Sequence, residues 1–130
     1  MARPKAKELT ERELEIMHVF WDRGESSVAE IRDELAASGR DLAYTTVATL
    51  VKILVDKRFV RQVNKKRPFR FVPVRSYEEV TRSLLGDFVH HVFRGSREQL
   101  LMQLMEQKPL SAKEREALKE LLAKKKSSRK

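Results

Sequence analysis

Near the N-terminus, hydrophobic residues recur at helical spacing in two segments, each opened by a capping box. In the first box, Thr10–Glu13, the hydroxyl and the carboxylate can each bind the other residue's backbone amide. It predicts a helix running to about Arg23, where Gly24 stops it. A second box, Ser27–Glu30, opens a helix that ends at Gly39. The side chains expected to face inward are Leu14, Ile16, Met17, Phe20 and Trp21 in the first helix and Val28, Ile31 and Leu35 in the second.

A third helical segment separates its hydrophobic and polar faces most clearly. The face opposite its hydrophobic stripe carries short, hydroxylated side chains and no acidic residue from Thr45 to Lys52. Short side chains let a helix approach the floor of a DNA groove, and threonine can bind a phosphate or contact a thymine methyl. The alternative is that threonines simply occupy an exposed face. The stripe follows the i, i+3, i+4, i+7, i+8 pattern of a buried surface, with Val47, Leu50, Val51, Leu54 and Val55.

After Lys57 the period changes from helix to strand. Phe59–Val63 and Phe69–Val72 alternate apolar and polar residues, and the turn between them, Asn64–Pro68, is strongly basic. A hairpin with a basic tip after three helices predicts a winged helix-turn-helix domain, whose third helix enters the major groove while the tip meets the DNA backbone. Exposed lysine and arginine also serve solubility, but their position after a groove-compatible helix favours phosphate contact.

Beyond Pro73 the chain is expected to be all-helical. One stripe repeats at every fourth residue from Val80 to Val92, the segment Arg97–Met105 is apolar on nearly all sides, and a capping box at Ser111–Glu114 opens a last helix. Three short helices cannot hide this much apolar surface within one chain, so we expect a two-fold dimer rather than helices folded back on their own domain. The expected dimer interface is Val80, Leu84, Phe88, Val92, Leu100, Leu101, Leu104, Met105, Leu118 and Leu121.

The predicted fold class is therefore mainly α with a small β-hairpin wing, in three parts. Residues 1–75 form the winged-helix DNA-binding domain, 76–125 the helical dimerisation domain, and 126–130 a basic tail expected to be disordered. The 130 residues contain no cysteine, which excludes disulfides and thiolate metal sites. Met1–Lys7 is basic without a following apolar core, so we expect no signal peptide, no membrane association and a cytoplasmic protein.

Most of the net charge of +9 lies in one stretch of the chain, which includes the third helix and the hairpin. Residues 36–70 hold nine Lys and Arg against Asp41 and Asp56. Basic groups near phosphates release condensed counterions, so this stretch favours a polyanionic partner, although basic runs are usually just solvated surface. No nucleophile and base are paired and no Gly-rich phosphate loop is present, so we expect no catalysis and no cofactor. Asp87, His90 and His91 lack further converging ligands, so we expect no metal site.

Several segments together resemble the penicillinase-repressor family, and the resemblance covers essentially the whole chain. It implies a homodimeric winged-helix repressor that binds palindromic operators of resistance or stress genes. The segments are Leu9–Met17 with Phe20-Trp21, then Ala43–Leu54, Phe93–Ser96 and Leu110–Glu114. Carried onto this chain, the resemblance implies DNA contacts by Tyr44, Thr45, Thr46, Thr49, Lys52, Lys65, Lys66 and Arg67. We expect Arg61, on the first strand of the hairpin, to join them.

Two departures leave the inducing signal open. Copper-responsive members of that family carry paired cysteines near the C-terminus, and this chain has none. Members that respond to beta-lactams are cleaved at an Asn-Phe bond, which aligns here with Gln103-Leu104, the candidate cleavage site for a sensor protease. Three functions stay open on sequence alone: a specific dimeric repressor, a nonspecific architectural protein that coats nucleic acid, and a protein-interaction adaptor. Activation in place of repression is also compatible with the pattern.

Overall fold

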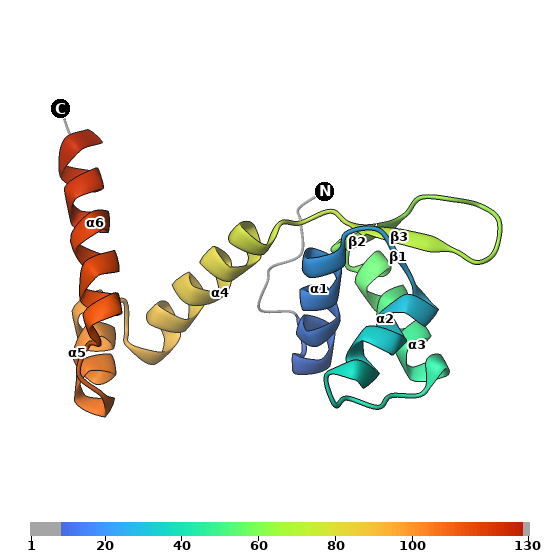
Figure 1. Cartoon of the computed structure of the whole chain (residues 1–130), viewed down its shortest axis with the longest axis horizontal. Helices are drawn as coiled ribbons and strands as arrows, with labels where there is room; N and C mark the ends of the chain where they lie inside the picture. Colours follow the sequence, from blue (N-terminus) through green and yellow to red (C-terminus); the bar gives the residue numbers. More distant parts are fainter. Residues whose placement is uncertain (1–8, 129–130) are drawn as a thin grey trace. The chain divides into compact units, whose positions relative to one another are not determined.

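The computed structural model describes residues 9–128, with side chains up to residue 125 (Figure 1). It confirms the predicted class, mainly helical with a small antiparallel sheet. The expectation about Met1–Lys7 and the last two residues of the tail lie outside the described residues. The elements are α1 (Glu11–Arg23), β1 (Ser26–Ser27), α2 (Val28–Ala37), α3 (Tyr44–Asp56), β2 (Val60–Gln62), β3 (Arg70–Pro73), α4 (Tyr77–Val92), α5 (Arg97–Gln107) and α6 (Ala112–Ser128).

The backbone packs into two compact units, Met1–Asp87 and Phe88–Lys130. The division falls inside α4, so the first part of this helix belongs to the unit that holds the winged domain. The functional boundary after residue 75 is a different kind of division and stays a prediction. The tail is helical to Ser128, in contrast to the disorder expected from its charge.

Local signals set the helix ends as the sequence predicts. Thr10 and Glu13 form a reciprocal capping box at α1, and Ser27 and Glu30 form another at α2. Gly24 ends α1 with a φ of 81°, a conformation that side-chain-bearing residues rarely adopt. The third box is also present, since the Ser111 amide donates to Glu114 Oε1 and the Glu114 amide donates to Ser111 Oγ. These caps satisfy amides that each helix would otherwise leave unpaired.

The core of the first unit lies between α1, α2, α3, the sheet and the start of α4. On α3 the buried residues are Val47, Val51 and Leu54, the centre of the predicted stripe, while Leu50 and Val55 are half-buried at its edges. On α1 the buried line is shifted from the predicted one, because Leu14 and Trp21 are only half-buried. The fully enclosed side chains include Ile16, Met17, Phe20, Ile31, Leu54, Phe59, Val60 and Val80.

The sheet has three strands in the order β1-β3-β2, all antiparallel. The hairpin pairs Arg61 with Val72 and Gln62 with Phe71, which confirms the predicted wing. The strand β1 was not predicted, because two serines carry no alternation and Ser27 reads as a helix cap. It pairs Ser26 with Phe71 and so ties the turn between α1 and α2 to the base of the wing.

Val80 does not belong to a surface that a second copy could cover, so its place in the predicted dimer interface is wrong. Its side chain is 0% exposed within the core of the first unit, and Leu84 is half-buried against the same core. The hydrophobic stripe on α4 continues beyond Leu84. A spacing of four residues does not distinguish the part of the stripe that packs on the core of its own chain from a part that a second copy would cover. His18 is exposed on α1 and lies edge-on to Trp21.

A buried carboxylate holds α1 to the end of α3. The Glu13 side chain is 4% exposed, and its Oε1 accepts from Lys57 Nζ at 2.9 Å and from the Thr10 amide at 2.9 Å. Burial alone would raise the pKa of Glu13, but these two hydrogen bonds and the Lys57 charge outweigh it and leave the pKa below its ordinary value of 4.5. The ionised pair is therefore part of what stabilises the winged domain.

Glu13→Gln is expected to lower the free energy of unfolding at neutral pH by about 1–2 kcal/mol, because a charge-assisted bond to Lys57 is lost. Since the folded pKa lies below the unfolded one, the pair stabilises the fold above about pH 4.5 and loses this effect as the pH falls further. The difference between the two proteins should therefore shrink on acidification, measured by urea unfolding across pH. Glu15→Gln, which breaks the exposed pair with Arg40, is the control with a small effect. A pH-independent difference for Glu13→Gln would contradict this assignment.

In the second unit, the apolar side chains of α5 and α6 are exposed to solvent. Residues of α5 and α6 are exposed almost without exception, and neither helix has a fully buried side chain among those described. No helix in the described part of the chain combines the length and hydrophobicity that crossing a bilayer requires. The predicted interface residues Phe88, Val92, Leu101, Leu104, Met105, Leu118 and Leu121 are 43–57% exposed, and Leu100 is half-buried.

Candidate nucleic-acid interface

The surface of α3 that points away from the core carries the predicted DNA contacts. Thr45, Thr49 and Lys52 are exposed, Tyr44 is 48% exposed and Thr46 is half-buried. The Thr49 hydroxyl donates to Thr45 O at 2.9 Å, which holds that side chain against the helix. No acidic side chain lies between Asp41 and Asp56 in the sequence. This face is therefore short, rigid and free of charges that would repel a phosphate.

The start of α3 adds to this surface. The residue before the helix is Ala43, which makes no side-chain cap among the described residues. The first amides of α3 thus keep their partial positive charge uncovered, and helix N-termini of this kind favour anions such as phosphate. The two earlier helices, by contrast, cover theirs with Thr10 and Ser27.

Arg32 of α2 lies beside the start of α3, a position that the sequence pattern does not predict. Its guanidinium lies 5.8 Å from the centre of the Tyr44 ring, at the beginning of α3. The two residues are far apart in sequence and come together only because α2 packs against α3. Arg32 also donates to Asp33 Oδ1 at 3.2 Å, so one part of its charge is already compensated. No local motif could have found this pair.

The tip of the wing presents three basic side chains to solvent. Lys65, Lys66 and Arg67 are exposed, and within the described part of the chain none of them has an ion-pair partner. The Arg67 guanidinium lies 5.0 Å from the centre of the Phe69 ring, which restrains this side chain without neutralising it. Arg61 is exposed on β2. These side chains are the ones that could reach the backbone of a duplex.

Arg70, at the base of the wing, has a different role. Its guanidinium pairs with Glu25 at 2.7 Å and with Glu30 at 3.1 Å. The hydrogen bond to Glu25 and the two carboxylates raise the pKa of Arg70, while the Ser27 amide and the Arg70 charge lower the pKa of Glu30. The charge of Arg70 is thus compensated, and the residue fastens β3 to the start of α2. Charge counting along the sequence could not separate it from the tip residues.

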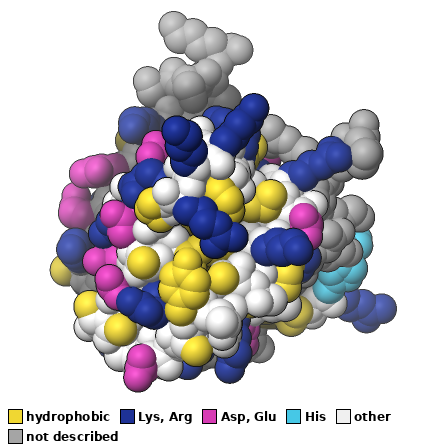
Figure 2. Space-filling view, turned by 90° about the vertical axis from the view of Figure 1, so that its right-hand side faces the viewer, with side chains coloured by type: hydrophobic (Ala, Val, Ile, Leu, Met, Phe, Trp, Pro, Cys, Tyr) yellow, Lys and Arg dark blue, Asp and Glu magenta, His cyan; other side chains and the backbone are white. Residues whose placement is uncertain are grey.

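Figure 2 shows basic side chains spread across one face of the molecule, around a patch of hydrophobic groups, with acidic side chains along one edge. The sequence accounts for this bias, because no Asp or Glu occurs between Asp56 and Glu78, a segment that includes the whole hairpin. A surface of this composition attracts polyanions from solution.

The sequence model of the family described as "Penicillinase repressor" matches residues 9–124. The chain belongs to the penicillinase repressor family. The members of this family are transcriptional repressors and not enzymes. The resemblance drawn from the residue pattern is thereby confirmed.

Relatives match over nearly the whole chain. The transcriptional regulator BlaI of Mycobacterium tuberculosis is 32% identical over 92% of this chain and 86% of its own length. The methicillin resistance regulatory protein MecI of Mammaliicoccus sciuri is 26% identical over 93% of this chain and 98% of its own length. DNA-binding regulators of transcription are thus the common class.

Solved structures agree on the fold. The solution structure of the DNA-binding domain of the repressor BlaI has a TM-score of 0.50 at 22% identity and covers 58% of this chain and 92% of that one. The structure of RosR from H. salinarum has a TM-score of 0.51 at 15% identity and covers 95% of this chain and 98% of that one. These similarities place the fold of the chain among winged-helix proteins.

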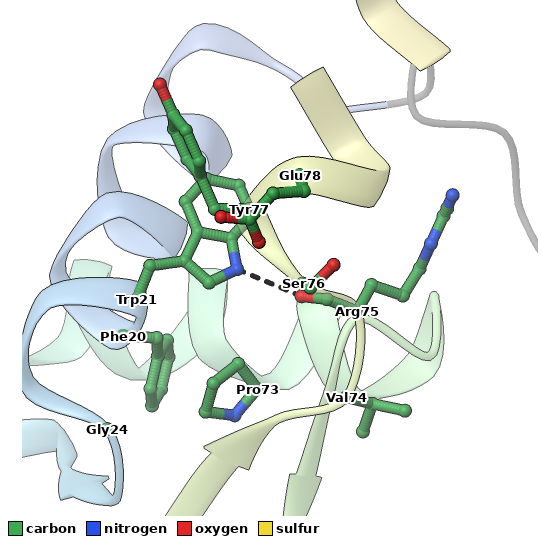
Figure 3. Close-up of a pocket in the computed structure, with 9 residues that line it drawn as sticks. All are labelled: Phe20, Trp21, Gly24, Pro73, Val74, Arg75, Ser76, Tyr77 and Glu78. Atoms are coloured by element: carbon green, nitrogen blue, oxygen red, sulfur yellow. Dashed lines mark hydrogen bonds between the residues drawn. The ribbon is translucent and has the colours of Figure 1, made fainter. Parts of the chain in front are cut away.

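A shallow pocket of about 400 Å³ lies where the wing leads into α4 (Figure 3). The Trp21 indole donates to Arg75 O at 2.9 Å, and the Tyr77 ring packs edge-on to Trp21 with 5.3 Å between ring centres. Arg75 is itself buried, paired with Glu79 at 3.0 Å and stacked over Phe59. Trp21 is half-buried at the edge of the core, and its hydrogen bond to Arg75 O joins α1 to the segment that leads into α4.

No site for a metal ion forms among the residues that the structure describes, where three His, Asp or Glu side chains do not converge. His90 and His91 lie edge-to-face with ring centres 4.9 Å apart.

Proposed function

We propose that this protein is a dimeric, sequence-specific repressor that binds a palindromic operator through α3 and the wing. The α3 of each subunit enters one major groove, reading base edges with Tyr44, Thr45, Thr46, Thr49 and Lys52, while Arg61, Lys65, Lys66 and Arg67 bind phosphates. The bound dimer blocks polymerase. Because the proposed partner is DNA, we place its action in the cytoplasm.

The observation that carries this proposal is the outward face of α3. An ordinary exposed helix face shows long Glu and Lys side chains, whereas this one has exposed threonines and one lysine, with Thr49 held against the backbone. Small side chains permit the close approach that base reading needs. The three basic side chains at the tip of the wing, which have no ion-pair partner in the described part of the chain, support the same orientation of α3 in the groove. They would supply phosphate contacts beside it.

The homodimer is supported by the second unit. Its helices α5 and α6 carry several leucine and methionine side chains that are each about half exposed, among them Leu101, Leu104 and Leu121. Many exposed apolar side chains on two helices favour an interaction site, and a second copy of the same chain would cover them symmetrically. A single wing reads too few bases to select one site in a genome, so two are needed.

The relatives suggest the regulated genes and the route of induction. MecI is named as a regulator of methicillin resistance, so resistance or stress genes are the targets we propose. A sensor protease would relieve repression by cutting at Gln103-Leu104. Both residues are exposed, but they lie within α5, so the helix must unwind locally before a protease can hold them extended.

A titration tests the proposed function. Genomic fragments are selected on the purified protein, and the best duplex is compared with a scrambled duplex of the same composition in physiological salt. A specific repressor should bind the selected duplex at least about a thousandfold more tightly. Equal affinities that fall steeply with salt would instead establish the alternative, a nonspecific architectural protein.

A further inference from the structure

The side chain of Asn64 spans the tip of the wing from the inside. Its Nδ2 donates to Lys66 O at 2.9 Å and to Pro68 O at 3.0 Å, and its Oδ1 accepts from the Arg70 amide at 2.7 Å. One side chain thus bonds to the backbone at three points around the loop 65–69. Asparagine suits this task because its short amide has both donors and an acceptor.

The strands close the loop immediately outside these bonds. The Val63 amide donates to Arg70 O at 2.8 Å, and Gln62 Nε2 donates to Asn64 O at 2.6 Å. The loop itself carries Lys65, Lys66 and Arg67 in direct succession. Like charges so close together repel one another, and the contact of Arg67 with the Phe69 ring restrains one of these three side chains but bonds no loop backbone. The bonds from Asn64 oppose this repulsion.

We propose that Asn64 is the positioning residue of the wing, which holds the backbone of the three basic residues in the conformation that binds DNA. This inference rests on the proposed function. A loop that is ordered before binding does not lose conformational freedom on binding, so its contacts translate more fully into affinity. Asn64 acts through its neighbours, since its amide is occupied by the loop backbone and is not directed at a ligand.

A double-mutant cycle on the full-length chain tests this role. The probe is the best duplex recovered from genomic fragments, and the second background carries Lys65→Gln, Lys66→Gln and Arg67→Gln. Asn64→Ala should weaken binding about tenfold in the native background and less than about twofold in the background without tip charges. Gln62→Ala, which leaves the three side-chain bonds of Asn64 in place, is the matched control and should stay within about twofold of native.

A second readout separates positioning from folding. In Asn64→Ala, amide hydrogen exchange should accelerate at Arg70, whose amide loses its acceptor, and stay unchanged for core amides such as that of Leu54. A loss of affinity of equal size in both backgrounds, no loss at all, or an equal loss in Gln62→Ala would each overturn the inference. If the native chain does not prefer the selected duplex over the scrambled one, the proposed function fails and the inference with it. A native preference with no effect of Asn64→Ala overturns the inference alone.

Discussion

Glutamate at both Thr49 and Lys52 is expected to lower operator affinity about a thousandfold, which is the smallest preference that we expect of specific over nonspecific binding. Both side chains are exposed on the outward face of α3, where no other acidic residue precedes Asp56. Two carboxylates there would face phosphates and base-edge acceptors in the groove. They would also remove the lysine contact, and in a dimer each effect occurs twice.

The comparison is a titration of the double variant against the native protein on the same operator duplex, with a thermal melt of each to show that the winged domain is intact. Lys52→Glu alone is matched by Lys119→Glu, which makes the same change of charge on the exposed surface of α6. The control should bind within a fewfold of native. Binding by the double variant that equals native would mean that α3 does not enter the groove and would favour a protein-interaction adaptor.

Aspartate at Leu104 and Leu118 is expected to convert the dimer into monomers and to weaken operator binding by at least about a hundredfold. These residues lie on α5 and α6, and they are 53% and 43% exposed in the single chain. Burying a carboxylate in an apolar interface is unfavourable. Two linked domains also bind a palindrome far more tightly than either domain alone, because the second binds at a high effective concentration.

Sedimentation velocity gives the oligomeric state, and a titration gives the affinity. Gln99→Asp, near the start of α5, introduces the same charged group at an exposed polar position and should leave both unchanged. A double variant that remains a dimer would place the interface elsewhere. A monomer that binds the operator as well as native would show that dimerisation is not needed for recognition.

The elements that the sequence predicts well are those set by neighbouring residues. The reciprocal caps at Thr10–Glu13 and Ser27–Glu30, the stop at Gly24 and the alternation in the hairpin all act over a few residues. The outward face of α3 also follows from periodicity alone, because its core residues Val47, Val51 and Leu54 determine which side of the helix faces solvent.

Features set by tertiary packing could not be predicted in this way. Val80 belongs to the core of the winged unit, although its spacing is the same as that of the residues beyond it on α4. Arg32 reaches Tyr44 only through the packing of α2 on α3, and the charge of Arg70 is compensated by Glu25 from the turn between α1 and β1. The bonds that Asn64 makes depend on the path of the loop, which its turn-forming composition does not specify.

The most direct test of a dimer whose two α3 helices occupy successive major grooves is the spacing of the half-sites. The operator found by titration is compared with the same duplex carrying five extra base pairs at its centre, about half a helical turn, and with one carrying ten. The five-base-pair insertion should abolish specific binding, because it turns one groove to the opposite side of the duplex, and the ten-base-pair insertion should restore part of it. Equal binding to all three duplexes would contradict recognition by a two-fold dimer.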